Sequence, residues 1–112
     1  MMSNQMTVVK GTSTAIAAKL QEYAQHAKGA FSDNTIRAIK NDTAIFSTWC
    51  LDNQHNPLPA SHETVAAFID AMTDSGRAWA TIKRYTSSIA HLHNAADIEN
   101  PCAHSFVKLA LK

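Results

Sequence analysis

Six histidines and two cysteines are the side chains of this 112-residue sequence best suited to bind a metal ion or act as nucleophile and base. His91 and His93 form the closest histidine pair, and Cys102 lies two positions before His104. A spacing of two on a helix directs side chains to different faces, so neither pair is arranged to hold one ion. The sequence contains no CxxC, HxxxH or HExxH pattern. We therefore expect no metal site and no cofactor.

The remaining reactive side chains also have structural interpretations. We interpret His55, His62 and His104 as solvent-exposed, and His91 and His93 as residues of a helix surface or its boundary. Cys50 lies on a predicted apolar helix stripe, where a thiol is usually unreactive. Tyr23 and Tyr85 lie on apolar helix faces and are expected in the core. No GxSxG, GxGxxG or P-loop pattern occurs, so we expect no catalytic residue.

Polar side chains gather on the predicted outward faces of two helices. Asn and Arg make paired hydrogen bonds to base edges, whereas Ser, Thr and Lys typically bind phosphates. Two such faces suit the binding of duplex DNA, although a solvated surface helix carries similar residues. The candidate DNA-binding residues are Asn34, Thr35, Arg37 and Asn41 on one helix, and Thr81, Lys83, Arg84, Ser87 and Ser88 on another.

The first two helices that position these residues are predicted from apolar periodicity. One runs from about Thr14 to Lys28, and the next begins at a cap formed by Ser32 or Asp33. Apolar residues then recur at spacings of three and four as far as Cys50, which is typical of a buried helix face. The Asn- and Pro-containing stretch 51–60 is predicted to be a loop.

Three further helices are expected after this loop. The third follows the cap Ser61, and the fourth runs from near Thr81 to Ala96. The fifth is expected to open with Asn100 as cap and Pro101 in the first helical position, and to continue to the last residues. No alternation typical of strands occurs. The sequence therefore predicts an all-α fold, a compact bundle of about five short helices.

The composition supports one folded domain. Apolar residues make up 46% of the chain and charged residues 17%, as in globular proteins. No apolar run approaches the roughly 18 residues of a membrane span, and the N-terminus lacks an apolar signal segment. Cys50 and Cys102 are interpreted as reduced, partly buried thiols, so we expect a cytoplasmic protein without a membrane partner.

The net charge of +1 is unevenly distributed along the chain. Residues 52–74 carry four acids and no Lys or Arg, whereas residues 75–112 carry five bases against two acids. An anionic partner is therefore expected on one side of the fold.

An ordered set of segments resembles the core-binding domain of tyrosine recombinases of the phage integrase type, in particular the Cre recombinase-like branch. The resemblance covers residues 28–112, whereas residues 1–27 match only as a tail and an additional N-terminal helix. It rests on AFSDNTIR (30–37), FSTWC (46–50), PLPA (57–60), VAAFI (65–69), TIKRY (81–85), SIAHLH (88–93), IENP (98–101) and VKL (107–109).

This resemblance implies a SAM-like, all-α DNA-binding domain that forms one half of a clamp around a recombination core site. The implied partners are double-stranded DNA, the protein's own catalytic domain and neighbouring protomers in a synaptic complex, with the isolated domain a monomer. Phe106, Val107 and Leu109 would contact a neighbouring protomer, or part of this apolar set, with Leu111, would complete the core of the isolated chain. The catalytic domain is expected outside this chain, because no histidine is followed by arginine three positions later. Ala38 and Ala80 stand where that branch tends to carry longer side chains, which implies a different sequence preference.

A second interpretation belongs to another class of function. The chain would be a helical protein-interaction module without a direct DNA role, and the apolar last helix would dock a partner. The two interpretations differ in the surface that a ligand should perturb. A DNA ligand would perturb the polar faces of the second and fourth helices, whereas a protein partner would perturb the first and fifth helices.

Overall fold

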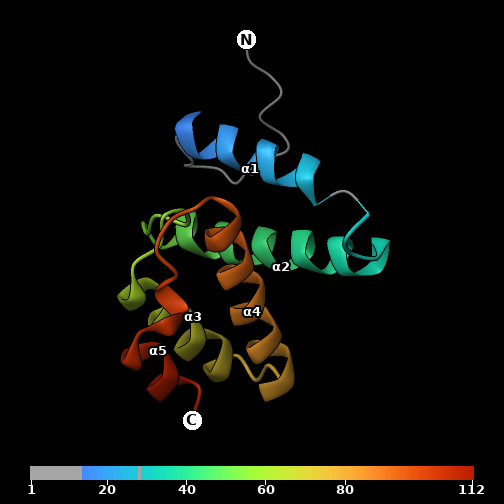
Figure 1. Ribbon diagram of the computed structural model, residues 1–112. Helices are drawn as coiled ribbons and strands as arrows, with labels where there is room; N and C mark the ends of the chain where they lie inside the picture. Colours follow the sequence, from blue (N-terminus) through green and yellow to red (C-terminus); the bar gives the residue numbers. More distant parts are fainter. Residues whose placement is uncertain (1–13, 28) are drawn as a thin grey trace.

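The computed structural model describes residues 14–27 and 29–112, and within these ranges every regular element is a helix (Figure 1). The predicted all-α fold is therefore confirmed. The elements are α1 (Thr14–His26), α2 (Asp33–Asp52), α3 (His62–Asp74), α4 (Trp79–Ala95), the 3₁₀ helix η2 (Pro101–Ala103) and α5 (Ser105–Ala110).

The starts of α2 and α3 follow from their capping serines. The Ser32 hydroxyl accepts a hydrogen bond from the Thr35 backbone N–H at 3.1 Å, and Ser61 does the same for Thr64. Each serine therefore satisfies one of the exposed amides of a helix N-terminus, as the sequence predicts. After α3, Gly76 adopts a φ of +87°, a left-handed conformation that ends the helix and that residues with a Cβ rarely adopt.

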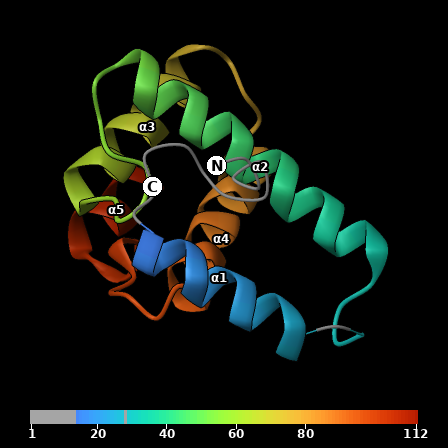
Figure 2. The same cartoon turned by 90° about the horizontal axis from the view of Figure 1, so that it is seen from above.

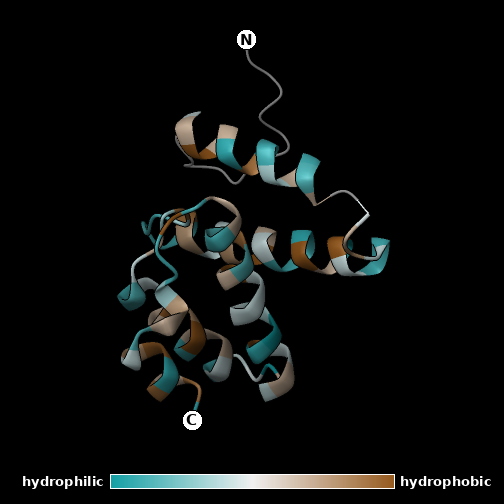
Figure 3. Ribbon diagram, viewed as in Figure 1, coloured by the Kyte–Doolittle hydropathy of each residue, from teal (hydrophilic) through white to brown (hydrophobic). Residues whose placement is uncertain are grey.

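The core lies where α2, α3 and α4 meet, with α5 closing it from below in the view of Figure 1. The Phe46 and Phe68 rings are edge to face, with centroids 5.0 Å apart. Tyr85 and Ile89 of α4 and Val107 of α5 are buried against them. Along α1 and α2, hydrophobic and hydrophilic residues are interleaved (Figure 3), as expected of helices with one apolar and one polar face.

The C-terminal region differs from the single helix predicted there. The Asn100 side chain accepts from the Cys102 backbone N–H at 3.0 Å and caps η2, not a long α-helix. His104 then adopts an extended backbone, with φ −72° and ψ 146°, and its Nδ1 accepts from the Phe106 N–H. The prediction of one continuous helix is therefore wrong, because a second cap interrupts it and starts α5 separately.

The first helix is a lightly attached arm. It lies across the second half of α4 and, among the described elements, contacts only that helix (Figure 2). The Tyr23 ring meets the His91 ring edge to face at 5.4 Å, and Lys19 pairs with Asp97 at 3.8 Å. None of its residues is fully buried. It ends at His26, and both Lys28 and the predicted tail at 1–13 lie outside the described residues.

Candidate functional site

The candidate residues of α2 lie on its exposed side. Asn34, Arg37 and Asn41 are spaced by three and four positions, which places them on one helix face, and all are exposed. The Arg37 Nη1 donates to the Asn34 Oδ1 at 3.2 Å, so one side chain orients the other. The Thr35 hydroxyl is also exposed and lies 2.9 Å from the Ser32 Oγ. The face thus presents amide and guanidinium groups to solvent.

On α4, Lys83 and Ser87 are exposed and lie one turn apart, whereas Thr81 is half-buried. The Lys83 Nζ lies 4.8 Å from the centroid of the Trp79 ring, within the range of a cation–π contact. Trp79 itself is 58% exposed, and its indole N–H donates to the Leu111 carbonyl at 2.8 Å. A basic group and an aromatic plane therefore occupy the start of α4.

The predicted outward position of Ser88 is wrong. Ser88 is 4% exposed, and its hydroxyl donates to the Asp42 Oδ2 at 2.7 Å. It lies on the side of α4 that packs against α2, so a phosphate in solution does not reach it. The serine instead satisfies a buried carboxylate on the neighbouring helix.

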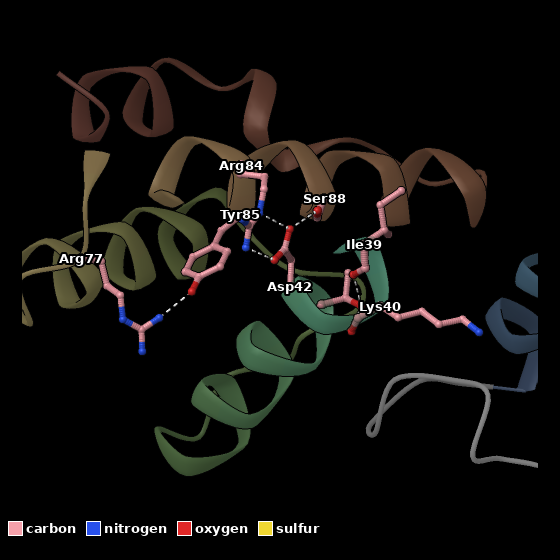
Figure 4. Close-up of polar contacts among 8 residues, drawn as sticks. Ile39, Lys40, Asp42, Arg77, Arg84, Tyr85 and Ser88 are labelled. Atoms are coloured by element: carbon pink, nitrogen blue, oxygen red, sulfur yellow. Dashed lines mark hydrogen bonds and ion pairs between the residues drawn. The ribbon is translucent and has the colours of Figure 1, made fainter. Parts of the chain in front are cut away.

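Arg84 is held by that same carboxylate (Figure 4). Its Nε donates to the Asp42 Oδ2 at 3.1 Å and its Nη2 to the Asp42 Oδ1 at 2.9 Å, a paired arrangement that fixes the guanidinium plane. Hydrogen bonding and charge from Asp42 raise the pKa of Arg84. Asp42 is fully buried, whereas the Arg84 side chain is 53% exposed. This contact joins α2 to α4.

Within the described part of the chain, the Asp42–Arg84–Ser88 network is the polar link between the two candidate helices. No ion pair or hydrogen bond there connects Asn34, Arg37 or Asn41 with Lys83 or Ser87. Sequence reasoning missed Asp42, which follows the exposed Asn41 and precedes the buried Thr43. The signal that could have found it is an acid at the edge of an apolar stripe.

His93 also has a role that the sequence did not indicate. It is fully buried, not a surface or boundary residue. Its Nε2 accepts from the Ala60 backbone N–H at 2.9 Å, and its Nδ1 lies 2.8 Å from the Ile89 carbonyl. This pattern requires the neutral ring with its proton on Nδ1. Burial lowers the pKa of His93.

Two of the other histidines, His55 and His62, are less exposed than expected. His55 is half-buried, stacks on Trp49 and lies 2.9 Å from the Thr64 hydroxyl. His62 is also half-buried and stacks on His104 with ring centroids 3.5 Å apart, whereas His104 is exposed as predicted. His91 is half-buried as a boundary residue, and burial lowers its pKa.

The two thiols are held in their protonated form. Burial raises the pKa of Cys50 to about 12, and it raises the pKa of Cys102 to about 12 as well. A thiol rather than a thiolate is the stable form of both side chains at neutral pH, which makes them poor nucleophiles.

A pocket of about 550 Å³ lies between the start of α3 and η2. Its titratable lining residues are His62, Glu63, Glu99 and His104. Among the residues with described positions, no group of three or more His, Cys, Asp or Glu side chains is arranged to hold a metal ion. No helix in those same ranges is long and apolar enough to cross a membrane.

Comparison with known proteins gives one informative similarity. No protein-family model matches the sequence. The chain is 34% identical over 83 residues to the integrase/recombinase xerD homolog of Selenomonas ruminantium. The match covers 71% of this chain and 24% of that protein, so the chain spans about a quarter of the length of the relative.

Proposed function

We propose that this chain is a DNA-binding, core-binding domain of a site-specific tyrosine recombinase, and that α2 and α4 contact the duplex. The observation that carries the proposal is the 34% identity to a protein described as an integrase/recombinase. The residues that cut and rejoin DNA would lie in a separate catalytic domain, because no His-x-x-Arg pattern occurs in this sequence. This chain would then supply binding and positioning, not chemistry.

The exposed side chains of the two helices suit that role. The amide and guanidinium groups of Asn34, Arg37 and Asn41 are suited to paired hydrogen bonds with base edges. Lys83 and Ser87 are suited to phosphate contacts that fix the register of the domain on the duplex. Thr35 and Thr81 would add hydroxyl contacts at the rim of this surface.

The distribution of charge supports the same orientation. The four acids of residues 52–74 are all exposed, and three of them lie on α3. Phosphates repel such a surface, so α3 would face away from the duplex. Ser88 is not among the proposed contacts, because its side chain is buried.

The test is an NMR titration of the ¹⁵N-labelled chain with a generic DNA duplex at low and moderate salt. Amide shifts should cluster on residues 34–41 and 81–87 and fade as salt rises, because phosphate binding releases counterions. Arg37→Ala and Lys83→Ala should each weaken binding, and a variant that loses a phosphate contact should lower the salt slope by about one.

Lys108→Ala on α5 is the matched control, since it removes one exposed charge from a helix outside the proposed contact surface. It should leave the affinity and the salt slope unchanged. Absence of any shift at low salt, with a folded sample, would contradict the DNA-binding proposal.

A second candidate function has its own supporting observation. Phe106 is 53% exposed and Leu109 is 65% exposed, which makes α5 a partly apolar surface suited to a neighbouring protomer or another protein. Val107 is fully buried, so in this chain it completes the core and is not part of this exposed surface. Shifts of the Phe106 and Leu109 amides that depend on protein concentration, without any response to DNA, would favour this interaction-module function.

A further inference from the structure

The Asp42 carboxylate has no contact with solvent, yet both of its oxygens are satisfied. Its Oδ1 accepts from the Arg84 Nη2, and its Oδ2 accepts from both the Arg84 Nε and the Ser88 hydroxyl. Removing a charged group from water is costly unless partners replace the lost hydration. The three donor groups belong to Arg84 and Ser88, which lie one turn apart on α4. The carboxylate therefore fixes two side chains of that helix at once.

The geometry of the Arg84 guanidinium determines which of its N–H groups can still bind a ligand. Asp42 occupies the edge formed by Nε and Nη2, which leaves Nη1 and the outer N–H of Nη2. Among the described residues, Nη1 of Arg84 has no hydrogen-bond partner. Because the side chain is about half exposed, this second edge is open to a ligand. Two parallel N–H groups of this kind match the O6 and N7 acceptors of guanine.

We propose that Asp42 is a positioning residue that holds Arg84 as a fixed reader of guanine in the major groove. The inference rests on the proposed DNA-binding function and deepens it by naming the base. Asp42 compensates the charge of Arg84, which weakens attraction to phosphate but leaves directional hydrogen bonding intact. The pairing also removes most rotamers of the long side chain before DNA arrives, so less conformational entropy is lost on binding.

The experiment first selects binding sites with the full chain from duplexes that have a randomised centre. Each guanine of the selected site is then replaced in turn by 7-deazaguanine, which lacks the N7 acceptor. One replacement should weaken binding of the unaltered chain by about tenfold or more. For Arg84→Lys, the single ammonium must stay beside the buried Asp42 carboxylate and cannot also reach the base, so the same replacement should have little effect.

Asp42→Asn tests the positioning role itself. The guanidinium stays in the chain but loses its carboxylate, so discrimination at that guanine should fall, while binding to unselected duplex stays the same or becomes stronger because the charge of Arg84 is no longer compensated. Thermal melting monitors the fold of each variant. If Asp42→Asn does not fold, Arg84→Lys and Ser88→Ala still test the positioning role. Ser88→Ala removes one of the three hydrogen bonds to Asp42 and should reduce the discrimination at that guanine.

Arg77→Lys is the matched control. Arg77 donates to the Tyr85 hydroxyl and not to a carboxylate, so its replacement should leave the guanine preference unchanged (Figure 4). An affinity, a salt slope and a guanine preference that all stay unchanged in Arg84→Lys would show a phosphate contact, which lysine makes as well, and would overturn the inference.

Two further outcomes separate this inference from the proposed function. A chain that binds generic duplex but enriches no sequence, or whose guanine preference survives Arg84→Lys, overturns the inference and leaves DNA binding intact. A folded chain that binds no duplex at low salt overturns the proposed function itself.

Discussion

Protonation of His93 would break the hydrogen bond that its Nε2 accepts from the Ala60 N–H. Burial lowers the pKa of His93 in the folded chain below its ordinary value of 6.5. The unfolded chain therefore binds this proton at higher pH than the folded chain does. Stability is full above about pH 6.5 and is lost as the pH falls toward the lower folded pKa.

Urea denaturation at about pH 7.5 and about pH 5.5 should accordingly give a smaller free energy of unfolding at the lower pH. His91 contributes in the same direction, because burial lowers its pKa too. In the variant His91→Ala, most of the decrease in the free energy of unfolding at the lower pH should remain, because His93 is still present. A free energy of unfolding that does not change over this range would contradict the buried, neutral state of His93.

The residues that sequence reasoning missed share one physical property, the distance in sequence to their partners. His93 bonds to a backbone group 33 positions away, and Asp42 bonds to side chains 42 and 46 positions away. Apolar periodicity reports which helix face is buried, but it does not identify the group that faces a polar residue there. Arg37 and Lys83 are exposed as predicted because they lie away from the apolar stripes of their helices, whereas Ser88 faces a polar partner on α2 that the stripe does not reveal.

At the scale of elements, the two serine caps differ in how much of the fold depends on them. The Ser61 hydroxyl bonds to both the backbone N–H and the hydroxyl of Thr64, and the Thr64 hydroxyl lies within hydrogen-bonding distance of His55. Ser61 thus connects the start of α3 to the segment that follows α2. The Ser32 cap lies at an exposed helix end, where the first turn can fray.

We therefore expect Ser61→Ala to reduce the free energy of unfolding by about 1–2 kcal/mol, and Ser32→Ala by about 0.5–1 kcal/mol. Denaturant unfolding monitored by circular dichroism measures both. Equal losses in the two variants would show that the network around Ser61 adds nothing to its cap.

Helix starts could be predicted where Ser or Asn occupies the cap and could not where another residue type does. The N-cap of α4 is Ala78, which makes no side-chain hydrogen bond, and the helix begins two residues before the predicted Thr81. The separation of η2 from α5 depends on the backbone conformation of His104, and histidine is a weak signal for a helix break. The ends that lack a capping side chain are thus set by tertiary packing.

At the scale of the molecule, the described elements divide into a helical body from α2 to α5 and the arm α1. Because α1 has no fully buried residue and α4 is the one described helix it packs against, deletion of residues 1–27 should leave the body folded. The loss of its half-buried Ile16, Leu20 and Tyr23 should lower the free energy of unfolding by about 1–3 kcal/mol.

An amide spectrum of the deletion variant checks this expectation. Changes should be confined to the second half of α4 and the turn that follows it, around His91 and Asp97, which lie beside α1. A loss of chemical-shift dispersion throughout the spectrum would instead show that α1 and the body fold as one cooperative unit.

On α2 and α4, the residues that join the helices are different from the residues that face solvent, and this separation affects how such a domain can change over evolution. The polar network that joins the helices uses Asp42, Arg84 and Ser88, whereas Asn34, Arg37, Asn41, Lys83 and Ser87 are exposed and take no part in it. Substitutions at these exposed positions leave the core packing and the network intact. A lineage can therefore vary this surface one residue at a time, and a protein engineer can build a randomised library there without first repairing the fold.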